Sequence, residues 1–282
     1  MKGFFDMLTM IEVLKAILFG VVEGITEWLP ISSTGHMILL DEFVKLNVSK
    51  EFLDLFLVVI QLGAILAVVV IYWNKLIPLS TKHGLHISRR KCKMWVKIIV
   101  ASIPAGVVGI LWDDVFTKYF YNYQTVAIML ILVGVVFIII ERSNKNKIAK
   151  IDSIDDISYG QAFLIGVFQM IAAIFPGTSR SGSTIVGSLM LGISRTAAAE
   201  FTFFLAVPAM FGGSAIKILK YSGGFNSLAV ALLAIGMIVA FVLSIIAIKF
   251  LMSYIKKHDF KVFGWYRIIL GIAVIGYFLA AR

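Results

Sequence analysis

The sequence has little cysteine and little charge. Cys92 is the only cysteine among 282 residues, which excludes an intrachain disulfide and a metal site built from several cysteines. Charged residues make up 15% of the chain, against about 25% in a typical soluble domain. A cleaved N-terminal signal peptide is not expected, because Glu12, Glu23 and Glu27 interrupt the apolar region. The chain is instead 60% apolar, which predicts an all-α polytopic membrane protein.

Long apolar runs approach the roughly 20 residues that are needed to cross a bilayer. Six of them predict transmembrane helices, at about 52–73, 95–112, 124–140, 197–218, 227–248 and 262–281. Two other apolar stretches, about 11–40 and 160–192, are each interrupted by a polar segment centred on a proline. Since each arm is too short to cross alone, we expect two re-entrant helical hairpins, buried in protein or lining a wet cavity.

The net charge of +10 comes from basic residues that gather in three loops, at about 74–94, 141–150 and 249–261. The loops at 113–123 and 221–226 hold one basic residue between them. This is the positive-inside pattern. We therefore expect the basic loops in the cytoplasm, both termini outside, and no nucleic-acid partner.

The two interrupted stretches resemble each other. Three pairs of residues match at a constant offset of 146: Gly20 and Gly166, Pro30 and Pro176, and Ser33 and Ser179. Three spans follow each stretch, so the single membrane domain 1–282 is predicted to contain two repeats, 1–141 and 155–282. Each repeat would cross the membrane an odd number of times. The second repeat is therefore expected to be inverted, with the two hairpin tips meeting near the midplane.

Arg180 stands in the second polar break, within the segment PGTSRSG. An arginine at the bilayer centre costs about 2.5–3.5 kcal/mol even on insertion scales, so we expect an anionic partner. A guanidinium group and a helix N-terminus both suit phosphate. The neighbouring residues that are predicted to bind a phosphorylated substrate are Gly177, Thr178, Ser181, Gly182 and Thr184. The alternative is a structural ion pair between Arg180 and Glu23 or Glu27.

Glu23 and Glu27 precede the first break and lie on one face of a helix, at positions i and i+4. Two carboxylates, together with phosphate oxygens, are ligands that a hard cation such as Mg²⁺ prefers. The acids are therefore candidate metal ligands; the alternative is a carboxylate pair that faces external water. Trp28 is expected to anchor the chain at the membrane interface.

Ser32, Ser33 and His36 follow Pro30 in the segment PISSTGH. If a helix resumes there, Ser33 and His36 lie one turn apart on one face, and a serine beside a histidine is the minimum for an activated nucleophile. The alternative is that the serines cap the helix and that His36 is a satisfied polar group. Gln61, within a span, is expected either to line a cavity or to form a hydrogen bond between helices.

The segments EGITEWLPISSTGH and PGTSRSGST resemble the two signature segments of the undecaprenyl-diphosphate phosphatase family, a bacitracin-resistance type of membrane phosphatase. The resemblance covers essentially the whole chain. It implies a C55 isoprenyl diphosphate as substrate, with the monophosphate carrier lipid and inorganic phosphate as products. It also implies a site open to the outer face of the bacterial plasma membrane, a divalent cation (Mg²⁺ or Ca²⁺), and protection against bacitracin, which sequesters the substrate.

The residues and the resemblance together give a mechanistic hypothesis. Arg180 and a cation near the two acids hold the diphosphate, Ser33 attacks the terminal phosphorus, and His36 takes the proton or later activates water. Ser32 contributes to substrate binding. Ser179, which matches Ser33 in the repeat, is the rival nucleophile, and direct attack by water is the third possibility. A flippase that moves the phosphorylated lipid without hydrolysis is the alternative function, and a homodimer is possible.

Overall fold

The computed structural model describes residues 2–80 and 86–280, so part of the first basic loop lies outside the described residues. The elements of the first half are α1 (Lys2–Thr26), α2 (Ser33–Phe43), α3 (Lys50–Ile71), α4 (Trp73–Leu76), β1 (Leu79–Ser80), β2 (His86–Ile87), α5 (Arg89–Phe120) and α6 (Tyr123–Asn144). Those of the second half are η1 (Ile154–Asp156), α7 (Tyr159–Ile174), α8 (Arg180–Met190), α9 (Arg195–Lys220), α10 (Ser227–Tyr254) and α11 (Lys261–Ala280).

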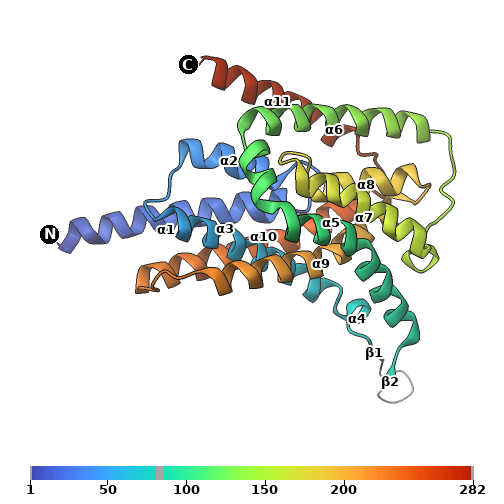
Figure 1. Ribbon diagram of the computed structural model, residues 1–282, viewed down its shortest axis with the longest axis horizontal. Helices are drawn as coiled ribbons and strands as arrows, with labels where there is room; N and C mark the ends of the chain where they lie inside the picture. Colours follow the sequence, from blue (N-terminus) through green and yellow to red (C-terminus); the bar gives the residue numbers. More distant parts are fainter. Residues whose placement is uncertain (1, 81–85, 281–282) are drawn as a thin grey trace.

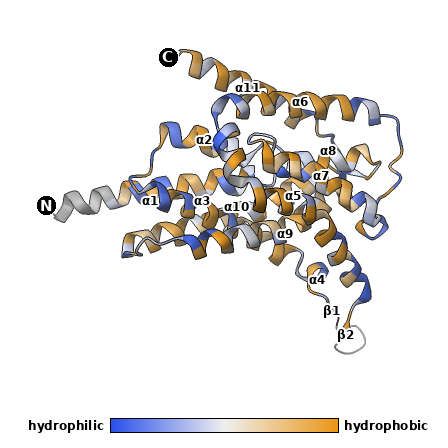
Figure 2. Ribbon diagram, viewed as in Figure 1, coloured by the Kyte–Doolittle hydropathy of each residue, from blue (hydrophilic) through white to orange (hydrophobic). Residues whose placement is uncertain are grey.

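The predicted fold class is confirmed. Within the described residues, six helices are long and apolar enough to cross a membrane, namely α3, α5, α6, α9, α10 and α11. They are apolar along most of their length (Figure 2). In that same part of the chain, β1 and β2 form the one sheet, a short antiparallel hairpin in the first basic loop. The chain is therefore an all-α polytopic membrane protein.

The two interrupted stretches fold as helix pairs, α1 with α2 and α7 with α8 (Figure 1). The prediction that each arm is too short to cross the membrane is wrong for the first arm. α1 has 25 residues and begins at Lys2 rather than near residue 11. Its charged residues, which include Glu12, Lys15 and Glu23, set it apart from the six apolar helices. The other three arms are short: α2 and α8 have 11 residues each and α7 has 16.

Glycines allow α1 and α7, the first helix of each pair, to pack closely against a neighbouring span. A Cβ atom added at Gly20 of α1 would lie 2.6 Å from the carbonyl oxygen of Gly236 in α10. A Cβ atom added at Gly166 of α7 would lie 2.2 Å from the carbonyl oxygen of Ala101 in α5. Because a lipid bilayer gives helices no hydrophobic drive to associate, such close contacts are a main source of their attraction. The matched glycines thus make the same kind of contact in both halves, which supports the predicted duplication.

α9 runs through the centre of the protein and buries a row of aromatic side chains. Phe201, Phe203 and Phe204 are fully buried. Trp28 lies at the first break and is also fully buried, and its ring meets that of Phe203 edge-on at 5.3 Å. The expectation that Trp28 anchors the chain at the membrane interface is therefore wrong. The residue instead fastens the first break to α9.

We predict that Gly166→Ala destabilises the protein, because its methyl group would force α7 away from Ala101 of α5. The midpoint of thermal unfolding in detergent, followed by circular dichroism, should fall by about 4 °C or more. Gly106→Ala is the control: its Cβ would meet no atom within 4 Å, and alanine is a better helix former than glycine. Equal midpoints for the two variants would contradict the role given to the close helix contact.

Candidate active site

Each polar break ends on a serine with an unusual backbone conformation. Ser32 and Ser179 have φ angles of 75° and 69°, the two positive values among non-glycine residues in the described ranges. Both side chains cap the helix that follows: Ser32 Oγ accepts from the Gly35 amide at 3.2 Å and Ser179 Oγ from the Gly182 amide at 3.1 Å. Backbone strain of this kind concentrates at functional sites. The breaks therefore have a defined, capped backbone conformation and are not frayed helix ends.

The matched caps correct the alignment of the two repeats. Ser32 corresponds to Ser179, so Ser33 corresponds to Arg180 as the first residue of its helix. The sequence alignment, anchored on the prolines, paired Ser33 with Ser179 and is wrong by one residue at this point. The second break holds one residue more between its proline and its cap. The argument for Ser179 as a rival nucleophile rested on the earlier pairing and therefore falls.

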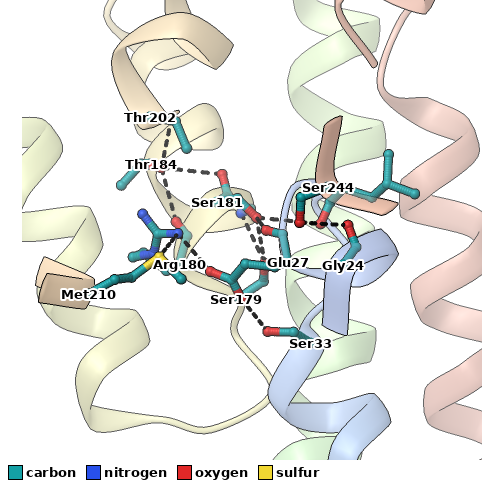
Figure 3. Close-up of polar contacts among 12 residues, drawn as sticks. Gly24, Glu27, Ser33, Ser179, Arg180, Ser181, Thr184, Thr202, Met210 and Ser244 are labelled. Atoms are coloured by element: carbon teal, nitrogen blue, oxygen red, sulfur yellow. Dashed lines mark hydrogen bonds and ion pairs between the residues drawn. The ribbon is translucent and has the colours of Figure 1, made fainter. Parts of the chain in front are cut away.

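The carboxylate of Glu27 joins the two breaks. Ser33 Oγ donates to Glu27 Oε2 at 2.5 Å, and Arg180 Nη2 donates to Glu27 Oε1 at 2.6 Å. Figure 3 shows the Glu27 side chain lying between these two groups. The ion pair considered as an alternative for Arg180 is thus present. It leaves the other guanidinium nitrogen, Nη1, buried without a hydrogen-bond partner among the described residues.

The serine and histidine that were expected to pair do not bond to each other. His36 Nδ1 lies 2.7 Å from the carbonyl oxygen of Ser32, and Nε2 lies 2.7 Å from the hydroxyl of Tyr266. Ser33 instead uses Glu27. Of the two alternatives, the Ser33–His36 pair is absent, and the satisfied polar role of His36 is confirmed because both its ring nitrogens are engaged.

Hydroxyls of the second break bond mostly to the protein. Ser181 Oγ donates to the carbonyl oxygen of Glu27 at 3.2 Å, and Thr184 Oγ1 lies 2.8 Å from Thr202 Oγ1 (Figure 3). Thr178 Oγ1 is buried and has no partner in the described part of the chain. Of the hydroxyls predicted to bind substrate in this break, Thr178 is therefore the one left to bind a ligand without losing a bond.

The two glycines of the second break serve close packing. Gly177 has a φ of 89°, and a Cβ there would lie 2.5 Å from the carbonyl oxygen of Val126 in α6. A Cβ at Gly182 would lie 3.2 Å from the Cβ of Ser179. Contact with the protein itself, and not only the approach of a ligand, therefore requires glycine at Gly177 and favours it at Gly182.

The sequence analysis missed Arg267 in α11. This fully buried side chain donates to the carbonyl oxygens of Pro30 at 3.2 Å, Gly177 at 2.7 Å and Thr178 at 2.9 Å. It thus fastens both breaks, and its positive charge lies beside them. The reasoning that singled out Arg180, an arginine within an apolar segment, would have found Arg267 too.

Glu23 lies one turn before Glu27, and it is 1% exposed. Its Oε1 has no hydrogen-bond partner in the described residues, and the side chain lines a cavity of about 170 Å³. Gln61 lines the same cavity, which decides between its two predicted roles. The described residues contain no cluster of three or more acids, histidines or cysteines. A cation here would therefore need substrate oxygens in addition to the two carboxylates, and the unpaired Glu23 oxygen fits that requirement.

Comparison with known proteins agrees with the motifs. The family model described as bacitracin resistance protein BacA matches residues 16–273. A protein of Desulfitobacterium hafniense named undecaprenyl-diphosphatase is 63% identical over 273 residues, which are 97% of this chain and 98% of that protein. Undecaprenyl-diphosphatase 1 of Clostridium acetobutylicum is 62% identical over 95% of this chain and 98% of its own. An undecaprenyl-diphosphatase of Enterococcus faecalis is 57% identical over 95% of this chain and 98% of its own.

The match includes both breaks, so every residue of the site lies within it. The relatives also match this chain over nearly its whole length. The chain belongs to the family of the bacitracin resistance protein BacA.

Proposed function

We propose that this chain is a membrane diphosphatase that hydrolyses undecaprenyl diphosphate to the monophosphate carrier lipid and inorganic phosphate. Relatives that match nearly the full length are named undecaprenyl-diphosphatase. The observation that carries the proposal is the Glu27 carboxylate, which holds a hydroxyl nucleophile on one oxygen and an arginine on the other. Recycling of this lipid supports cell-wall synthesis, and removal of the diphosphate protects against bacitracin.

Ser33 is the proposed nucleophile. Its oxygen attacks the terminal phosphorus while its proton moves to Glu27, which already accepts the hydroxyl hydrogen. The Oγ–P bond forms, the bridging P–O bond breaks, and the lipid monophosphate leaves with the electron pair. Water then attacks the phosphoserine, Glu27 returns its proton to the serine oxygen, and inorganic phosphate is released.

The two arginines have different roles in this proposal. Arg180 has a buried, unpaired Nη1, which is available to a phosphate oxygen. Arg267 donates its hydrogen bonds to backbone carbonyl oxygens of both breaks and so holds the breaks together. Phosphoryl transfer depends mainly on such preorganised positive charge. We assign the proton transfer to Glu27 rather than His36, because the ring nitrogens of His36 are occupied by Ser32 and Tyr266.

Glu23 and Glu27 are the residues that would hold a divalent cation, Mg²⁺ or Ca²⁺, in the presence of substrate. When bound, such an ion neutralises part of the phosphate charge.

The site is proposed to open to the extracytoplasmic side of the bacterial plasma membrane, with both termini on that side. The first two basic loops lie at the opposite end of the molecule from the described ends of α1 and α11 (Figure 1), and basic loops favour the cytoplasm. The two repeats are proposed to be inverted relative to each other, and a homodimer stays a prediction.

Removing either partner of the central ion pair should abolish hydrolysis. Glu27→Gln cannot take the serine proton, and Arg180→Ala removes the phosphate ligand, so phosphate release from a C55 diphosphate should fall by about 10³-fold or more in each. Ser214→Ala in α9, distant in sequence from both breaks, is the control. Full activity of Glu27→Gln would refute the assigned base. A lipid-transport activity without phosphate release in the unaltered protein would favour the flippase.

The two candidate serines can be separated by mutation. Ser33→Ala should lose about 10⁴-fold in kcat or more, because a nucleophile is lost. Ser179→Ala removes a helix cap worth about 1 kcal/mol, so it should chiefly lower the unfolding temperature. Ser179→Asn keeps a capping side chain that tolerates positive φ, and should restore stability. The reverse pattern, with Ser179→Ala inactive but stably folded, would make Ser179 the nucleophile.

Cation dependence gives a third test. Phosphate release by the purified protein should stop in a chelator and return on addition of Mg²⁺ or Ca²⁺. Glu23→Gln should raise the half-saturating cation concentration by about tenfold or more, since half of the carboxylate pair is neutralised. Chelator-resistant hydrolysis would rule out the cation role given to the two acids.

A further inference from the structure

Two adjoining cavities connect the site to one end of the molecule. The inner one, of about 170 Å³, reaches Glu23 at its deep end and is also lined by Gln61, Asp54 and Lys217. The outer one, of about 240 Å³, is lined by Asp54 and Lys217 again, together with Lys220 and Ser222. Since they share two lining residues, the cavities adjoin, and together they outline a path. It runs along the first half of α3 and the last turns of α9.

The path carries charged and polar side chains among apolar ones, although it begins within the apolar bundle. Glu23 lines its inner end and keeps one buried oxygen without a hydrogen-bond partner in the described chain. Lys217, at the junction of the two cavities, is exposed, and its side chain has no hydrogen bond or ion pair to any described residue. A lysine with no protein partner retains its three donors for a ligand.

The proposed reaction requires such a path. The lipid monophosphate can remain in the bilayer, but inorganic phosphate carries charge that hydrocarbon does not tolerate, and water must reach the phosphoserine. Asp54 beside Lys217 opposes tight retention of an anion. A pathway conducts an ion when its sites bind strongly enough to admit it and weakly enough to release it.

We propose that the two cavities form the aqueous path by which inorganic phosphate leaves, and that Lys217 is the residue on which it docks. This inference rests on the proposed phosphatase function. Lys217 makes no contact with the reacting atoms, so it is a positioning residue for the product and not a catalytic one.

The first measurement tests the path without using activity. In a Cys92→Ser background, Val58→Cys, which lines the inner cavity, is exposed to a charged thiol reagent in lipid nanodiscs. Ile238→Cys is the control, because Ile238 is 58% exposed on the lipid side. Its neighbour Met237 packs against Gly63 of α3, so the control lies beside the same helix as Val58. Val58→Cys should react at least about tenfold faster, because a thiolate forms in water and not in hydrocarbon. Equal rates would refute the path.

The second measurement tests the docking residue. Inorganic phosphate should slow the modification of Val58→Cys by the thiol reagent. Lys217→Gln should raise the phosphate concentration that halves the modification rate by about tenfold, which is the effect of one charge-assisted hydrogen bond. The same substitution should raise the phosphate concentration that half-inhibits lipid hydrolysis. Lys118→Gln, in the last turn of α5, removes the same charge at a residue that lines neither cavity and should change neither value.

The outcomes separate the two proposals. If the unaltered protein hydrolyses the lipid but Lys217→Gln behaves like Lys118→Gln, the docking inference fails and the function stands. If the unaltered protein releases no phosphate from the lipid, the proposed function fails, whatever the labelling shows.

Discussion

The site depends on one buried carboxylate. Glu27 accepts hydrogen bonds from Ser33 and Arg180, which belong to breaks 147 residues apart in the chain. A buried charge that loses its partner costs about 3–5 kcal/mol, so neither break can move far without the other. The ion pair is therefore a geometric constraint: it holds the hydroxyl and the guanidinium group on opposite oxygens of one acid.

The matched caps account for how two distant segments reach the same acid. Ser33 and Arg180 are both the first residue after a capping serine, so equivalent backbone positions of the two halves aim at one point. Divergence of those two positions, hydroxyl in one half and guanidinium in the other, gave the pair its chemistry. Glu27 itself aligns with Ala173, so only one half supplies the acid. A symmetric scaffold thus carries an asymmetric site.

The sequence was sufficient for the six spans, both breaks and the site residues as a group, because apolar run length and buried charge leave strong signals. The sequence was not sufficient to align the two breaks, where a shift of one residue changes which side chains correspond. The prolines aligned Ser33 with Ser179, but the second break is one residue longer, and only the cap geometry reveals this. The prediction for Trp28 failed for a different reason. An indole suits both a membrane interface and a protein core, and its packing on Phe203 depends on the tertiary structure.

Burial of the site in the membrane also explains why its charges come in balanced number. Glu23 and Glu27 face two arginines, Arg180 and Arg267, and all four side chains are buried or nearly so. In hydrocarbon an unbalanced set would be costly to fold. In the free protein Glu27 is paired with Arg180, while Arg267 bonds to backbone carbonyl oxygens. A diphosphate adds negative charge, and this set can accept it only if a cation enters too or if Arg180 turns from Glu27 to the phosphate. The second event frees one oxygen of Glu27 from its ion pair as the substrate arrives, when the proposed attack requires an acceptor for the serine proton.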